Sequence, residues 1–224
     1  MSYFDTKSQS FKDMMVMIDS MATKFNIPKD DLITKLLQIS FHETAGTYDD
    51  QSIQLQGQPG QEGMGAFHFE HGKSQGGHTA INRLIQINED KYRLLDSLGV
   101  PTAVADTSKF PLYLKNLPIS KGTATDPEDL YFSGSQGFDA RTFSPSEQWM
   151  LMIADISKDL ELAGISDISN ISSEDLWIDH HSVPDAADEA ARRATYQGNM
   201  NIWNVPSEDP LTQPILDQLL NYNP

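Results

Sequence analysis

The residue of this chain best placed for chemistry is Glu43, an acid that follows an apolar helical pattern. From Asp30 to Phe41 apolar residues recur at spacings of three, four and seven, which is typical of an amphipathic helix. Glu43 stands seven residues after Leu36, so it projects from the apolar face near the C-terminal end of that helix. A carboxylic acid against apolar neighbours has a raised pKa and can donate a proton near neutrality. Cleavage of a glycosidic bond needs such an acid beside the leaving oxygen.

Position alone also allows Glu43 to bend outward to solvent or to pair with an arginine, and this interpretation stays open. The segment after the helix favours a ligand site, because residues 57–77 hold seven of the 14 glycines of the chain. Glycines let a backbone approach a ligand closely, and a long irregular segment in a compact domain indicates function or disorder. Within it GMGAFHFE, residues 63–70, alternates as a short strand does. One face would carry Ala66, His68 and Glu70, and the other Phe67 and Phe69.

These segments together carry a family resemblance. The pattern SFHETAGTYDD…GMGAFHFEHG…GGHTAINRL resembles the lysozyme-like fold in its lytic-transglycosylase branch. Glu43 and Thr44 would match the Glu-Ser pair at the end of the catalytic helix of that branch. GMGAFHFE resembles the Gly-x-Gly-Leu-Phe-Gln-Phe-Glu segment of phage-encoded relatives, where it forms part of the substrate cleft. The helix at Trp149–Lys158 and LWIDHH at residues 176–181 agree with later elements of such proteins only in order.

The resemblance implies an enzyme that cleaves the β-1,4 glycan of peptidoglycan, with Glu43 acting first as acid and then as base. In that branch the 6-hydroxyl of the sugar is the internal nucleophile, so no second carboxylate is required. A hydrolytic lysozyme would instead recruit Asp49, Asp50 or Glu70. The residues expected to contact the substrate are Thr44, Tyr48, Gly63, Gly65, Phe67, His68 and Glu70.

Several of these positions allow two interpretations. Threonine at position 44 keeps the hydroxyl of the usual serine, whereas histidine at position 68 replaces the usual glutamine. A histidine still donates or accepts a hydrogen bond, but it adds a titration near neutrality. It therefore fits either an altered sugar subsite or a relative that has lost activity. The rings of Tyr48, Phe67 and Phe69 are candidates to stack on sugar, although for both phenylalanines packing in the core is the favoured interpretation.

Two other classes of function compete with this one. Three histidines between residues 68 and 78 and a His-His pair at 180–181 carry ligand types that suit zinc. HFEH lacks the helical His-Glu-x-x-His spacing, however, so we expect no metal and no cofactor. The alternative function is that of a non-catalytic phage virion structural or ejection protein with a lysozyme-like fold, whose partners would be other virion proteins.

The net charge of the chain limits the kinds of partner that it can bind. It has 16 Lys and Arg against 32 Asp and Glu, a net charge of −16, which repels nucleic-acid phosphates and anionic membranes. We expect no nucleic-acid partner and no membrane span, since no run approaches about 18 apolar residues. There is no cysteine and no signal-peptide pattern. We expect the protein in a virion or in the host cytoplasm during assembly, acting at the bacterial cell wall.

The elements that must position these residues are mostly helices. The expected fold is mostly α, of the α+β kind, with a small β or irregular insertion after the catalytic helix. We expect a single lysozyme-like domain over residues 1–224, with a motif-bearing core at about 30–98, a loop-rich insertion at about 99–143 and C-terminal helices over 144–224. Helices are predicted at Phe11–Phe25, Asp30–Phe41, His78–Leu98, Ser144–Gly164, Ser173–His181, Asp185–Tyr196 and Leu211–Leu220.

Overall fold

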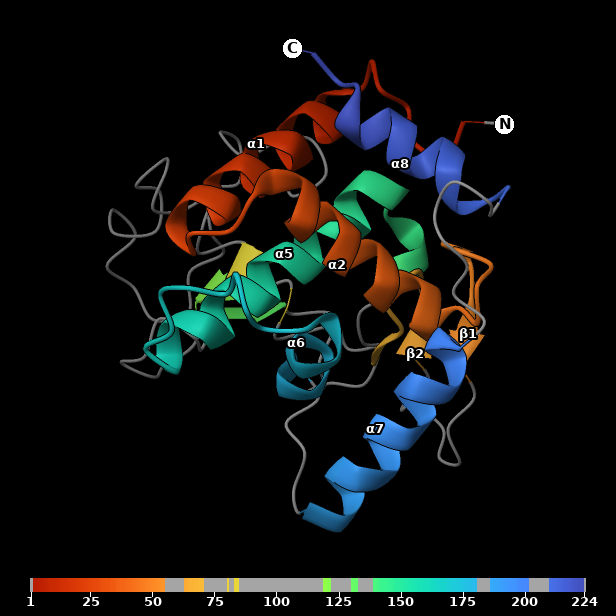
Figure 1. The fold of residues 1–224 in the computed structure, drawn as a ribbon. Helices are drawn as coiled ribbons and strands as arrows, with labels where there is room; N and C mark the ends of the chain where they lie inside the picture. Colours follow the sequence, from red (N-terminus) through yellow and green to blue (C-terminus); the bar gives the residue numbers. More distant parts are fainter. Residues whose placement is uncertain are drawn as a thin grey trace. The chain divides into compact units, whose positions relative to one another are not determined.

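The fold is mostly helical, as the sequence predicted. The computed structural model describes residues 2–54, 63–70, 80, 83–84, 119–121, 130–132, 139–180, 186–201 and 210–223. Helices hold most of these residues, whereas each strand has two or three (Figure 1). The described helices are α1 (Gln9–Lys24), α2 (Lys29–Glu43), α5 (Pro145–Leu162), α6 (Ser173–His180), α7 (Ala186–Met200) and α8 (Thr212–Leu220). The helix predicted at His78–Leu98 falls largely outside the described residues.

The chain divides into two compact units. Met1–Asp50 and Ile156–Pro224 form one unit, and Gln51–Asp155 form the other, so the division falls inside α5. The single lysozyme-like domain expected over residues 1–224 stays a prediction. Within the part of the chain described here, no helix is long and apolar enough to cross a membrane.

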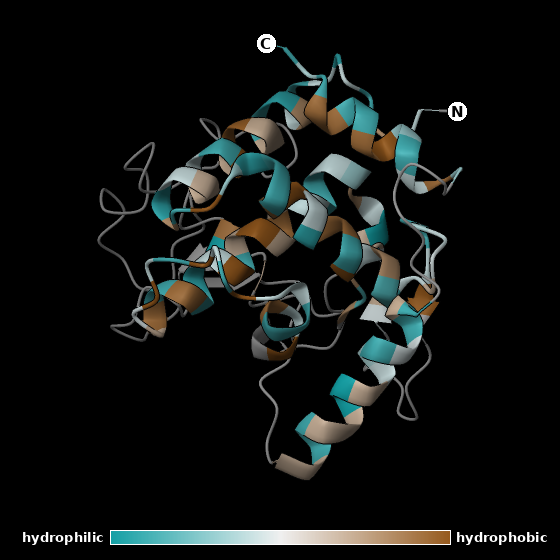
Figure 2. Ribbon diagram, in the orientation of Figure 1, coloured by the Kyte–Doolittle hydropathy of each residue, from teal (hydrophilic) through white to brown (hydrophobic). Residues whose placement is uncertain are grey.

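In the first unit α2 packs against α1, α6, α7 and α8. The helix begins at Lys29, directly after Pro28, whose fixed φ suits the start of a helix. Asp30 and Asp31 in the first turn face the positive end of the helix dipole. Figure 2 shows hydrophilic and apolar residues alternating along α1 and α2, as amphipathic packing requires. Their buried residues include Phe11, Met14, Met15 and Ile18 of α1 and Leu32, Ile33, Leu36 and Leu37 of α2.

The second unit holds short antiparallel strands and the first part of α5. Strands β1 (Ile53–Gln54), β2 (Gly63–Met64) and β3 (Phe69–Glu70) form one sheet in the order β1-β2-β3. Strands β4 (Ile119–Lys121) and β5 (Leu130–Phe132) pair inside the segment for which only loops were expected. A 3-10 turn at Ala140–Thr142 precedes α5.

The single strand predicted over residues 63–70 is wrong. This segment is a hairpin, in which β2 and β3 pair Gly63 with Glu70 across a turn at residues 65–68. The turn forms because Gly65 and His68 have φ of +82° and +46°, a region that reverses the chain and that strand residues do not adopt. The predicted alternation of faces therefore does not hold, and Ala66 and Phe67 are both buried.

Candidate active site

Glu43 is the last residue of α2, and it faces inward as the sequence predicted. Its side chain is buried, with 9% of the residue exposed. The indole Nε1–H of Trp177, in α6, donates a hydrogen bond to Glu43 Oε1. Both residues belong to the first unit. A carboxylate from one helix is thus joined to a tryptophan from another, 134 positions further along the chain.

Three rings pack together beside this carboxylate. His42 of α2 lies 4.4 Å from Trp177 of α6 and 4.7 Å from Tyr196 of α7, between ring centroids. The rings of Trp177 and Tyr196 are 5.4 Å apart. These separations are in the range of favourable aromatic pairs. Because each ring comes from a different helix, the cluster holds α2, α6 and α7 together where Glu43 lies.

Asn199 of α7 contacts both the ring and the backbone of His42. Its Nδ2 atom lies 3.1 Å from His42 Nδ1 and 3.5 Å from the His42 carbonyl oxygen. A carbonyl oxygen only accepts, so the atom facing it is the amide NH₂ group, which also donates to Nδ1. Asn199 thus holds the His42 ring from α7.

The surroundings of Glu43 act on its charge in opposite directions. Burial disfavours the ionised carboxylate, and so does the negative end of the helix dipole at the C-terminus of α2. The hydrogen bond from Trp177 favours the ionised form. Burial raises the pKa of the Tyr196 phenol above its usual range, and the nearby charges of Glu174 and Glu43 also raise this pKa. Tyr196 is therefore a protonated phenol at physiological pH.

The hydroxyl of Thr44 caps α2. Thr44 Oγ1 donates to the Ser40 carbonyl over 2.7 Å and accepts from the Tyr48 backbone N–H over 2.8 Å. The only proton of this hydroxyl is thus used inside the helix end. The structure thus gives Thr44 a capping role, which the sequence did not indicate, and the substrate contact expected for Thr44 stays a prediction.

The turn after Glu43 concentrates unusual backbone conformations. Gly46 N–H donates to the Phe41 carbonyl and Ala45 N–H to the His42 carbonyl, the two bonds of a Schellman motif. Ala45, Gly46 and Tyr48 have φ of +49°, +84° and +53°. Such values are uncommon outside glycine and cluster at functional sites.

The stacking roles proposed for three aromatic rings do not fit their burial. Tyr48 is 2% exposed, and its Oη lies 2.6 Å from Thr212 Oγ1 in α8. Phe67 is 1% exposed and packs edge-to-face on Trp149 at 5.8 Å. Phe69 is buried as well. All three rings are buried, which agrees with the core-packing alternative for both phenylalanines. The substrate contacts expected for Tyr48 and Phe67 stay predictions.

The predicted residues of the second unit shape the hairpin. His68 Nε2 lies 2.7 Å from Ser52 Oγ, and Gly63 is constrained because an added Cβ would lie 2.8 Å from the Cβ of His68. At Gly65 an added Cβ would collide with the Gln148 side chain. Gln148 Oε1 accepts from the Ala66 N–H over 2.7 Å. Because Gly65 has no side chain, Gln148 can lie close enough to the turn to make this bond. The side chain of Glu70 lies outside the described residues.

The predicted site residues thus fall into two sets. Glu43, Thr44 and Tyr48 belong to the first unit, and Gly63, Gly65, Phe67, His68 and Glu70 to the second. The substrate cleft that the resemblance implies stays a prediction. Asp49 is exposed and Asp50 half-buried, as solvated loop residues are. Sequence reasoning missed Trp177, Tyr196 and Asn199 as neighbours of Glu43 and His42, and no local pattern pointed to them.

A metal site finds no support in the residues that are described, because no three His, Asp or Glu side chains among them gather closely enough. His71, His78 and His181 lie outside those residues. No family model, curated protein or solved structure matches the chain. An assignment of function therefore depends on the geometry around Glu43 and on the resemblance of its motifs.

Proposed function

We propose that this protein cleaves β-1,4 glycan bonds of peptidoglycan, as a lytic transglycosylase or muramidase, with Glu43 as its acid and base. The observation that carries the proposal is the buried carboxylate at the end of α2 with an indole N–H on one of its oxygens. The proposal places the protein with phage-encoded, virion-associated enzymes of this kind, in agreement with the resemblance of its motifs.

Cleavage by this mechanism requires the Glu43 carboxyl group to be neutral first and ionised afterwards. Neutral Glu43 donates its proton to the glycosidic oxygen as the bond from that oxygen to the anomeric carbon breaks. The carboxylate then takes the proton of the sugar 6-hydroxyl, whose oxygen bonds to the anomeric carbon. The product is an anhydrosugar, and no water is consumed.

The environment of Glu43 supports this double role. Burial and the C-terminal end of α2 favour the neutral acid before the sugar binds. The Trp177 N–H stabilises the carboxylate once the proton has left. An exposed glutamate has no such opposed influences and stays ionised at neutral pH.

The test is digestion of purified peptidoglycan by the native protein and by Glu43→Gln, with products identified by mass spectrometry. Asp49→Asn is the matched control, because it removes an exposed carboxylate from the same turn. We expect anhydromuropeptides from the native protein and from Asp49→Asn, and a loss of at least about 100-fold in Glu43→Gln.

Other outcomes would redirect the assignment. Products with reducing ends would keep the glycosidase but require a second carboxylate and a water. Absence of products from folded native protein would refute the proposal and favour the non-catalytic virion role.

A further inference from the structure

We propose that Trp177 is the positioning residue of this site. Its indole N–H makes Glu43 Oε1 the oxygen that accepts a hydrogen bond, so Oε2 is the oxygen that carries the transferred proton. This inference rests on the proposed function for its catalytic meaning. The bond between Trp177 Nε1 and Glu43 Oε1 is present in the structure whatever the reaction.

The indole N–H of Trp177 is a hydrogen-bond donor and never an acceptor. The oxygen that it faces must therefore offer a lone pair in both protonation states of Glu43. In a neutral carboxyl group the carbonyl oxygen is the better acceptor, so the hydroxyl proton lies on the other oxygen. Trp177 thus selects Oε2 as the acid oxygen and prevents the group from exchanging its two oxygens by rotation.

A positioning residue must itself be held in place, and Trp177 is. It is 4% exposed, and the rings of His42 and Tyr196 pack on it. His42 is in turn bonded to Asn199. The start of α6 is attached to α2 by Ser173 Oγ, which donates to Gln38 Oε1 over 2.6 Å.

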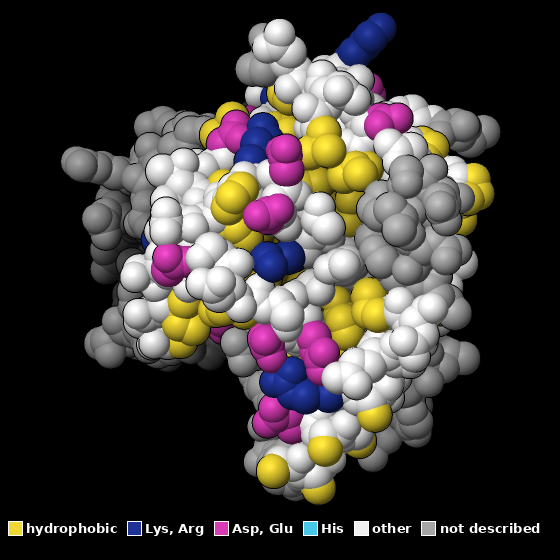
Figure 3. Space-filling model, in the orientation of Figure 1, with side chains coloured by type: hydrophobic (Ala, Val, Ile, Leu, Met, Phe, Trp, Pro, Cys, Tyr) yellow, Lys and Arg dark blue, Asp and Glu magenta, His cyan; other side chains and the backbone are white. Residues whose placement is uncertain are grey.

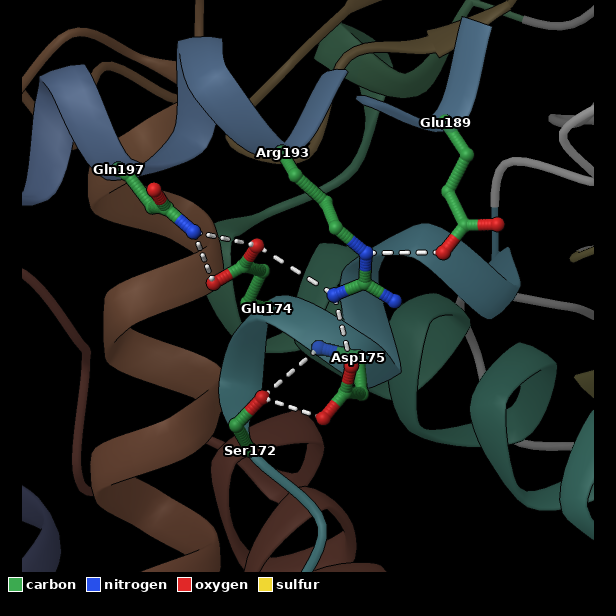
Figure 4. A network of polar contacts seen from close by, with 6 residues as sticks. All are labelled: Ser172, Glu174, Asp175, Glu189, Arg193 and Gln197. Atoms are coloured by element: carbon green, nitrogen blue, oxygen red, sulfur yellow. Dashed lines mark hydrogen bonds and ion pairs between the residues drawn. The ribbon is translucent and has the colours of Figure 1, made fainter. Parts of the chain in front are cut away.

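A polar network attaches α7 to α6, the helix that carries Trp177 (Figure 4). Arg193 of α7 donates to Asp175 over 2.7 Å and to Glu174 over 3.3 Å, both in α6. Gln197 Nε2 also donates to Glu174, over 3.1 Å. Figure 3 shows basic side chains between acidic ones over α6 and α7. The helix that carries Trp177 is thus held from two sides.

Loss of the indole N–H should change the proton affinity of Glu43 in one direction. Burial and the end of the helix dipole remain, and both favour the neutral acid. Without the opposing hydrogen bond, the pKa of Glu43 should rise by about one to two units, since a bond to a charged group has that strength. Glu43 would then hold its proton more tightly, so it would be a weaker acid toward the glycosidic oxygen and would be ionised only at higher pH.

The experiment compares Trp177→Phe, which keeps an aromatic ring and removes the donor, with Tyr196→Phe, which removes a hydroxyl from the adjacent ring. Carbon NMR follows the titration of the Glu43 carboxyl in both variants, and the pH profile of peptidoglycan cleavage is measured beside it. We expect the titration and the activity profile to move to higher pH in Trp177→Phe and to move much less in Tyr196→Phe. An unchanged titration in folded Trp177→Phe would overturn the inference.

A second measurement does not depend on the stability of that variant. The Trp177 indole proton should exchange slowly with solvent in the native protein and in Glu43→Gln, because the amide oxygen still accepts, and at least about 10-fold faster in Glu43→Ala. Equal exchange in Glu43→Gln and Glu43→Ala would also overturn the inference. If both NMR results hold but native protein cleaves no glycan, the carboxyl group is positioned as described, and the proposed function and the proton transfer from Oε2 fail.

Discussion

Replacement of Thr44 by valine tests whether this residue serves the helix end or a substrate. Valine keeps the shape of threonine and removes the hydroxyl, so two buried hydrogen bonds are lost. The Ser40 carbonyl still accepts from the Thr44 N–H over 3.1 Å, whereas the Tyr48 N–H loses its side-chain acceptor. A buried donor without a partner costs about 1–3 kcal/mol, so we expect the free energy of unfolding to fall by about 2 kcal/mol.

The chain offers a matched control for this substitution in the same helix. Thr34 Oγ1 donates to the Asp30 carbonyl over 2.9 Å with the same spacing of four residues, but at an exposed position. Thr34→Val should therefore change the free energy of unfolding by less than about 0.5 kcal/mol. Thr44→Ser keeps the hydroxyl and should lose about 0.8 kcal/mol for one buried methyl group.

Urea denaturation followed by circular dichroism measures all three variants under one set of conditions. Peptidoglycan cleavage by Thr44→Ser, measured below its unfolding transition, should equal that of the native protein. The capping argument would be refuted if Thr44→Val and Thr34→Val were equally stable. A Thr44→Val variant that has native stability but binds no glycan would support the predicted substrate contact of Thr44.

Two further predictions concern the same unit. Ala45→Gly should raise the free energy of unfolding by about 1 kcal/mol, because φ of +49° is costly for alanine, and a lower melting temperature would contradict this. The Ser172 hydroxyl, and then Arg193, lower the pKa of Asp175. The ionised Asp175 carboxylate therefore adds to the stability of the folded protein above the ordinary pKa of about 4. This contribution is lost as the pH falls through the lowered pKa of the folded state. The stability difference between native protein and Asp175→Asn should therefore shrink from pH 5 to about pH 2, and a difference that grows would refute it.

Local patterns were sufficient for the helices. The spacing from Leu32 to Leu37 predicted α2, and its continuation placed Glu43 on the apolar face, because the face on which a helical residue lies follows from its position. The helix predicted at Ser144–Gly164 is α5, and the Ser144 N–H donates to Glu147 Oε2 over 2.6 Å at its start. A capping box involves residues three apart, so the sequence contains all of its parts.

The hairpin at residues 63–70 shows where local patterns were insufficient. Alternation of residue types is the same in one strand and in two very short strands with a turn. The φ of His68, +46°, decides between them. The His68 ring contacts Ser52, and the same turn is held at Ala66 by the side chain of Gln148. Histidine adopts a positive φ more often than most residues, but only in a small minority of its positions, so the sequence did not predict it.

The sequence by itself determined that Glu43 ends an amphipathic helix and points inward, since both facts depend on neighbours within seven residues. Only the tertiary structure decided what the carboxylate meets. Trp177 lies 134 positions from Glu43, and Asn199 lies 157 positions from His42. Such contacts arise when α6 and α7 pack on α2, and packing depends on the shapes and polar groups of whole helix faces. The presence of an inward acid was therefore local information, whereas its hydrogen-bond partner was a property of the fold.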